Sequence, residues 1–185
     1  LGHSSRAAQS LELALTLIQP RHDVVRTGRI TGALGQVYVQ AGHWEAAEQS
    51  LRKALAIADA HGDVGQSAVL QNSIGKLHQA QEQDSKALTA YRESGRLAHL
   101  AKLSDVEGMA WVDTARIAQR MGLPVDAGQA LVQARTIVAG WTESHAKAEA
   151  LTAMALVELA LAEQVAQDRA AREQSALKLL EEATA

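Results

Sequence analysis

The chain has no cysteine, no phenylalanine and two prolines, and aromatic residues make up only 3% of its 185 positions. Without cysteine it can hold no disulfide, no thiolate metal site and no cysteine nucleophile. Sandwiches and barrels are rich in aromatic residues and turns, so this composition disfavours both. Alanine, the strongest helix former, occurs 37 times. The sequence therefore predicts an all-α protein.

The chain also lacks a strong charge of one sign and a long apolar run. Its 18 basic and 21 acidic side chains give a net charge of −3, so no overall field favours nucleic acid or an anionic membrane. No stretch approaches the ~18 apolar residues of a membrane span, and residues 1–20 lack a signal-peptide pattern. We predict a cytoplasmic protein. Because the chain opens at Leu1 inside an amphipathic pattern, we interpret it as a segment of a longer one.

A shift of 40 residues brings the sequence into register with itself. The recurring positions lie four and three residues apart, which places them on one face of a helix. They are Ala7, Ala47, Ala87 and Ala127, then Leu11, Leu51, Tyr91 and Leu131, then Ala14, Ala54, Ser94 and Ala134. A second set of residue pairs recurs with the same period: Leu34-Gly35, Ile74-Gly75, Thr114-Ala115 and Met154-Ala155. In the first three units, the second residue of the pair lies twelve residues before the recurring alanine. Each unit is therefore expected to contain two helices.

Glycine inside a helix costs about 1 kcal/mol relative to alanine. The small residues Gly35, Gly75, Ala115 and Ala155 are therefore expected at close contacts between helices. Gly42 and Gly122 mark helix ends, and Pro124 marks a helix start. The pattern predicts helices at 4–19, 23–41, 44–61, 64–81, 84–102, 105–121, 124–139, 143–163 and 168–184.

The fourth unit departs from the period. Its alanine and leucine set occurs at Ala176, Leu180 and Ala183, nine residues later than expected, and no glycine or proline marks a turn before it. Either the chain turns near Gln167-Asp168, or residues 143–184 form one nearly continuous helix. We expect the turn.

The segment LGQVYVQAGHWEAAEQSLRKAL at Leu34–Leu55 resembles the tetratricopeptide repeat (TPR) signature. The matching positions are Leu34, Gly35, Tyr38, Gly42, Ala47, Leu51 and Ala54. The ~40-residue period exceeds the usual ~34 and is similar to the repeats of kinesin light chains and bacterial signalling proteins. The resemblance implies a right-handed α-α superhelix in a single array, 1–185. We divide it into a closing helix of a preceding repeat at 4–19, repeats at 23–62, 64–102 and 105–139, and a divergent repeat at 143–184.

Residue types that carry catalysis are present but do not cluster. None of the seven histidines lies in a plausible array with acids or a second histidine, as metal binding or acid–base chemistry requires. Gly28 and Gly32 are isolated in a helical stretch, so they form no phosphate-binding loop. We therefore predict no catalytic residue, no metal site and no cofactor, and a chain that is not an enzyme.

The first helix of each repeat is expected to line a concave groove. Amides there can hold the backbone of an extended peptide, and cations can pair with carboxylates. In the first three repeats, four cations lie on this stripe without an acid among them, which suggests an acidic peptide as the ligand. The predicted groove residues are Arg29, Gln36, Gln40, Asn72, Lys76, Gln79, Arg116, Gln119 and Arg120.

These observations favour a non-catalytic module that binds a protein or peptide partner, with no nucleic acid and no membrane. The alternative is a regulatory sensor or oligomerisation array that controls an attached effector domain in a signalling protein or transcription activator. The terminal helices also lack a polar capping face. Self-association is therefore expected through Leu11 and Leu15 or through Leu177 and Leu180.

Overall fold

The computed structural model describes residues 2–18, 23–142 and 145–184, with side chains described at 6–18, 23–142 and 146–169. Within these ranges the chain forms eight α-helices and no strand, which confirms the all-α prediction. They are α1 (Gly2–Ile18), α2 (Val24–Ala41), α3 (Trp44–Ala60), α4 (Val64–Ala80), α5 (Asp84–Ala101), α6 (Ser104–Arg120), α7 (Pro124–Ala139) and α8 (His145–Thr184). The first seven lie within two residues of their predicted ranges.

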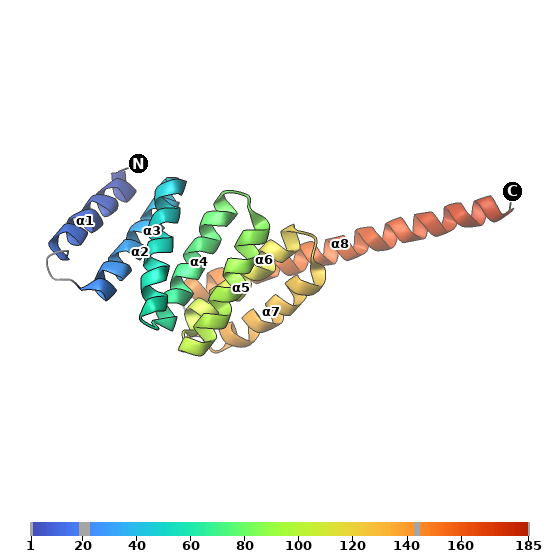
Figure 1. Ribbon diagram of the computed structural model, residues 1–185. Helices are drawn as coiled ribbons and strands as arrows, with labels where there is room; N and C mark the ends of the chain where they lie inside the picture. Colours follow the sequence, from blue (N-terminus) through green and yellow to red (C-terminus); the bar gives the residue numbers. More distant parts are fainter. Residues whose placement is uncertain (1, 19–22, 143–144, 185) are drawn as a thin grey trace.

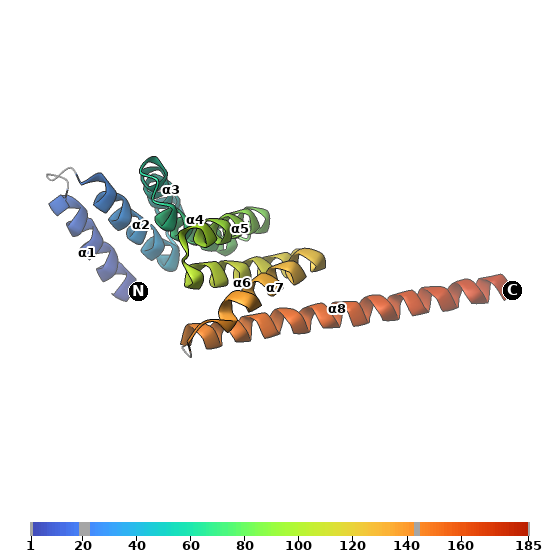
Figure 2. The same cartoon turned by 90° about the horizontal axis from the view of Figure 1, so that it is seen from below.

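The helices stack as a solenoid (Figure 1). The most extensive packing lies within the pairs α2 with α3, α4 with α5, and α6 with α7. Helix α1 packs against α2, and the first part of α8 packs against α6 and α7. The later part of α8 extends beyond the other helices (Figures 1 and 2). None of the described helices combines the length and apolar character that a membrane crossing needs.

Small residues bring the two helices of a pair into close contact. A Cβ atom added to Gly35 would lie 2.7 Å from Leu51 Cγ, and one added to Gly75 would lie 2.6 Å from Tyr91 Cδ1. Ala115 is fully buried. These three positions confirm the prediction, but Ala155 is exposed and the prediction is wrong there. No second helix in the described part of the chain covers Ala155, because α8 does not turn back.

The turn expected at Gln167-Asp168 is absent, since α8 runs without interruption from His145 to Thr184. The segment has neither glycine nor proline and is rich in alanine, so nothing in it opposes helix propagation. Ala176 and Leu180 therefore continue the helix that begins at His145 instead of forming a second one.

Gly42 and Pro124 mark helix boundaries as predicted. Gly42 ends α2 in the left-handed conformation, with φ of 77°, and Pro124 is the first residue of α7. Asp23 and Asp63 cap α2 and α4, because each side chain accepts a hydrogen bond from a backbone N–H three residues later. Such a cap satisfies one of the unpaired N–H groups at a helix start.

The buried apolar side chains of the described residues form clusters that follow the solenoid. One cluster, with Leu51, joins α2, α3 and α4. The next, with Ile117, joins α5, α6 and α7. A third, with Met154, joins α6, α7 and α8. The core thus runs along the length of the array, as expected for repeats that bury their faces against neighbours.

A larger side chain at a helix contact tests this packing. Ala47 is fully buried in α3, as is Ala87 at the equivalent position of α5, whereas Ala56 of α3 is exposed. We expect Ala47→Leu and Ala87→Leu each to lower the free energy of unfolding by about 1–3 kcal/mol through overpacking. Ala56→Leu, the control, should change it by less than about 0.5 kcal/mol. Urea unfolding followed by circular dichroism measures all three. Equal stability of Ala47→Leu and Ala56→Leu would contradict the close contact.

Candidate functional site

A cavity of about 380 Å³ lies where α2, α4, α6 and the start of α8 come together. These are the first helices of successive repeats, so the cavity occupies the predicted concave groove. It is lined by Gln36, Val39, Gln40, Val69, Asn72, Ser73, Lys76, Asp105, Val106, Met109, Trp141 and Ala146. Four of the nine predicted groove residues, Gln36, Gln40, Asn72 and Lys76, are among them.

The amide groups of the cavity differ in how they are satisfied. Gln36 Nε2 donates a hydrogen bond of 3.0 Å to Ser73 Oγ, which donates to the carbonyl of Val69. Asn72 Nδ2 is buried and has no hydrogen-bond partner in the described structure. A buried donor without a partner costs about 1–3 kcal/mol, and a rotation of the half-buried Asn72 side chain toward the cavity would let a ligand oxygen relieve this cost.

Apolar side chains form much of the remaining wall. Val39, Val69, Val106 and Met109 come from the three inner helices, and Trp141 comes from the connection after α7. The Trp141 ring fits because residue 108 is glycine: a Cβ atom there would lie 2.5 Å from Trp141 Cζ2. Sequence reasoning left the role of Trp141 open between a local packing contact and an exposed contact. The structure gives it both packing on α6 and a place in the cavity wall.

Lys76 is the one cation among the described residues that line the cavity. Its side chain is exposed, and it forms no hydrogen bond or ion pair with the described residues. The positive charge of Lys76 interacts electrostatically with the buried carboxyl group of Asp113 in α6. Burial raises the pKa of Asp113, and the nearby charges of Arg116 and Lys76 oppose that rise. Lys76 can therefore accept a carboxylate from a ligand without breaking an ion pair.

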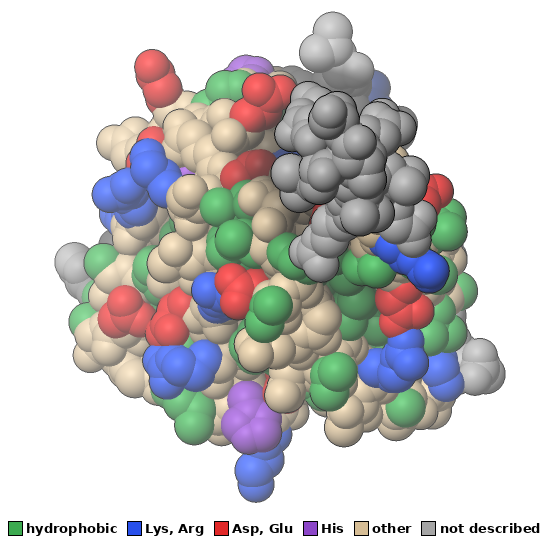
Figure 3. All heavy atoms as spheres, turned by 90° about the vertical axis from the view of Figure 1, so that its right-hand side faces the viewer, with side chains coloured by type: hydrophobic (Ala, Val, Ile, Leu, Met, Phe, Trp, Pro, Cys, Tyr) green, Lys and Arg blue, Asp and Glu red, His purple; other side chains and the backbone are tan. Residues whose placement is uncertain are grey.

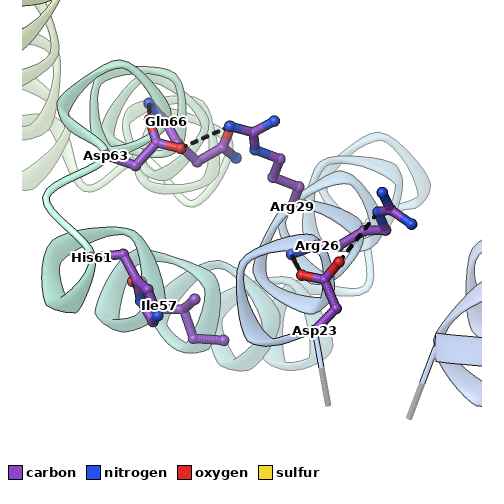
Figure 4. A network of polar contacts seen from close by, with 7 residues as sticks. All are labelled: Asp23, Arg26, Arg29, Ile57, His61, Asp63 and Gln66. Atoms are coloured by element: carbon purple, nitrogen blue, oxygen red, sulfur yellow. Dashed lines mark hydrogen bonds and ion pairs between the residues drawn. The ribbon is translucent and has the colours of Figure 1, made fainter. Parts of the chain in front are cut away.

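The other three predicted cations already have acidic partners, which lie outside the stripe. Arg29 pairs with Asp63 at 3.0 Å (Figure 4). Arg116 pairs with Asp113. Arg120 donates from Nε to Asp84 at 2.8 Å, and this contact raises the pKa of Arg120.

None of these three arginines lines the cavity. On the end face in Figure 3 the acidic and basic side chains are likewise interspersed. The acids come from other helices or from an off-stripe position, so the stripe alone did not reveal them.

The two remaining predicted residues, Gln79 and Gln119, also lie outside the cavity lining. Gln79 Oε1 accepts hydrogen bonds from the Tyr91 hydroxyl at 2.7 Å and from Arg116 at 3.3 Å. Burial raises the pKa of Tyr91, so its hydroxyl stays protonated and continues to donate. Gln79 thus joins α4 to α5 and α6 rather than facing a ligand.

A second, more open cavity of about 1280 Å³ lies between α5 and α7, with α6 at its floor. Its charged side chains pair with one another, as in Arg92 with Asp126 at 2.9 Å and His99 with Glu107 at 3.0 Å. Trp111 Nε1 is buried without a partner, but the indole lies against Gly95 of α5. The charged residues described in this lining are therefore already paired within the chain, unlike Lys76 in the first cavity.

Among the described side chains, no group of three or more His, Asp or Glu is placed to hold a metal ion. Polar recognition by amides and one lysine is the chemistry that the first cavity provides.

The chain is similar to a solved structure, BtubC (BKLC) from P. vanneervenii, with a TM-score of 0.66 and 17% sequence identity. The match covers 77% of this chain and 61% of the BtubC chain, so it spans less than two thirds of that protein. At this identity the likeness shows the fold, a helical repeat. No protein-family model and no curated protein sequence matches the chain.

The contact between Arg29 and Asp63 generates a pH-dependent prediction (Figure 4). Hydrogen bonds from the Gln66 N–H and from Arg29 lower the pKa of Asp63. The carboxylate therefore stabilises the fold above its unfolded pKa of about 4, and this contribution is lost as pH falls through the lower folded value.

We expect Asp63→Ala to cost about 1 kcal/mol near pH 7 through loss of the cap. Asp63→Asn, which keeps a capping oxygen but not the charge, should cost less. Both differences from the wild type should shrink at acidic pH. Urea unfolding at neutral and acidic pH measures these differences. An Asp63→Ala protein that is as stable as the wild type near pH 7 would show that the Asp63 cap does not stabilise α4.

Proposed function

We propose that the chain is a non-catalytic interaction module of the TPR type that binds an extended peptide segment in the cavity between α2, α4, α6 and α8. The observation that carries this proposal is Asn72, whose Nδ2 is buried without a partner beside Gln36, Gln40 and Lys76. The helical repeat fold supports it, because such solenoids present extended concave surfaces to their partners.

An extended peptide fits this chemistry better than a compact polar ligand. Its backbone carries regularly spaced carbonyls and N–H groups, and an amide side chain can both donate and accept. Asn72 and Gln40 can pair with the peptide backbone, while Val69 and Met109 contact its apolar side chains. The four residues come from α2, α4 and α6, so the peptide crosses the inner helices.

We expect the peptide partner to carry an acidic side chain at one position only. Arg29, Arg116 and Arg120 are satisfied within the chain, so Lys76 is the side chain that would receive a ligand carboxylate. Asp105 also lines the cavity and disfavours a second acid next to it. The preferred peptide therefore has one acidic side chain opposite Lys76 and uncharged neighbours.

A second candidate function is a regulatory or oligomerisation array that controls an attached effector domain. The observation that favours it is an exposed apolar face on α8, with Leu151 48% and Leu159 58% exposed. A face of this kind on a soluble protein marks an interaction surface. It lies away from the cavity residues, so the two functions are compatible in one chain.

Random twelve-residue peptides displayed on phage, selected on the purified chain, test the groove. Affinities of the selected peptides are then measured by fluorescence anisotropy. We expect Asn72→Ala to weaken binding about tenfold, the loss of one buried hydrogen bond. Lys76→Glu should weaken peptides that contain an acid, and the wild-type affinity for them should fall as salt rises.

Lys53→Glu, on an exposed position of α3 outside the cavity, is the charge-matched control and should bind as the wild type does. Thermal unfolding of each variant checks that the fold is retained. Selected peptides that bind Asn72→Ala and Lys76→Glu with unchanged affinity would contradict the proposed site.

A further inference from the structure

Each repeat carries two small residues on its first helix, seven positions apart. In the first three repeats these residues are all buried: Gly28 and Gly35, Ala68 and Gly75, Gly108 and Ala115. The second helix of the same repeat covers them, as Ile57 covers Gly28 and Tyr91 covers Gly75. Forty residues further, the equivalent positions on α8 are Ala148 and Ala155, and both are exposed. The fourth repeat thus has a docking face for a second helix and no described helix on it.

The rest of this face is also apolar. Leu151 and Leu159 lie on the same side of α8 as the two alanines and are 48% and 58% exposed. The opposite side, with Ala150 and Met154, is buried against α6 and α7. Helix α8 therefore has two apolar faces, of which the solenoid covers one.

A sequence suited to cover the other face is present in the chain. Ala176, Leu180 and Ala183 repeat the spacing of Ala47, Leu51 and Ala54, the residues through which α3 packs into its pair with α2. Because α8 is continuous, Leu180 lies 25 residues beyond Ala155, about 37 Å along the helix. The covering sequence cannot reach the open face of its own chain.

We propose that two copies of the chain pair through α8 in antiparallel orientation, so that residues 168–184 of each copy cover the Ala148–Leu159 face of the other. The pairing is symmetric and closes with two copies. It uses a surface separate from the peptide cavity and stands whether or not that cavity binds a peptide.

The contacts between α2 and α3 fix the register. There Gly35 faces Leu51 and Gly32 faces Ala54. The equivalent pairs are Ala155 with Leu180 of the second copy, and Thr152 with Ala183 of the second copy. Both pairs place the two-fold axis between Gln167 and Asp168, the point at which the repeat pattern predicts a turn. The dimer thus supplies the contact that a turn would otherwise provide.

The size of the interface agrees with this arrangement. The overlap from residue 151 to residue 184 is about 50 Å long and about 10 Å wide. That strip is on the order of 500 Å² in projection and larger in accessible area, close to the roughly 800 Å² per partner of a stable interface.

Sedimentation equilibrium of the purified chain tests the pairing. We expect twice the mass of one chain for the wild type, and a single-chain mass for Leu159→Arg and for a chain truncated before Asp168. The matched control is Val132→Arg. Val132 is similarly exposed, at 64%, but lies on α7 and not on α8, so this variant should stay dimeric. A monomeric wild type, or equal dissociation of both arginine variants, would overturn the proposal.

Disulfide trapping tests the register, because the natural chain has no cysteine. Oxidised Ala155→Cys/Leu180→Cys should run as a covalent dimer on a non-reducing gel, whereas Ala155→Cys alone should stay monomeric. A covalent dimer of Ala155→Cys alone would indicate parallel pairing. An internal disulfide in a monomeric double variant would show that the helix folds back on its own chain. Either result would overturn the antiparallel dimer.

Discussion

The close approach of the two helices within each repeat is the constraint on which the rest of the structure depends. At Gly35 and Gly75 there is no room for a Cβ atom, because Leu51 and Tyr91 occupy that space. This contact sets how far apart the helices of a pair lie, and therefore how α2, α4 and α6 stand beside one another. The cavity between those inner helices is a consequence of the stacking. Among the described polar groups of this cavity, the stacking leaves Asn72 Nδ2 and Trp141 Nε1 buried without a hydrogen-bond partner.

Most of the fold could be predicted from the 40-residue period, because small and apolar residues at helical spacing specify both the helices and their contacts. Side-chain positions in the groove were harder to predict. Arg29 and Arg120 meet acids 34 and 36 residues away in the sequence, and a stripe on one helix does not reveal partners supplied by the next. Gln36, Gln40, Asn72 and Lys76 line the cavity, because helical spacing alone places them on the side of α2 and α4 that faces it.

Trp141 was left undecided for a related reason. It lies in a connection, where helical spacing gives no direction to a side chain, and its environment depends on Gly108, 33 positions earlier. The ion pairs between repeats add little to stability on their own, since their side chains are largely exposed and such pairs contribute about 0–1 kcal/mol.

Helix α8 shows how one repeat pattern can be satisfied in two ways. A turn at Gln167-Asp168 would let the chain cover its own apolar face, but it would break several backbone hydrogen bonds in a segment without glycine or proline. A continuous helix keeps those bonds and leaves the face to a second copy. The balance between the two depends on protein concentration, because association stabilises the open form by mass action. The missing turn signal therefore has a physical consequence: it exchanges a contact within the chain for one between chains.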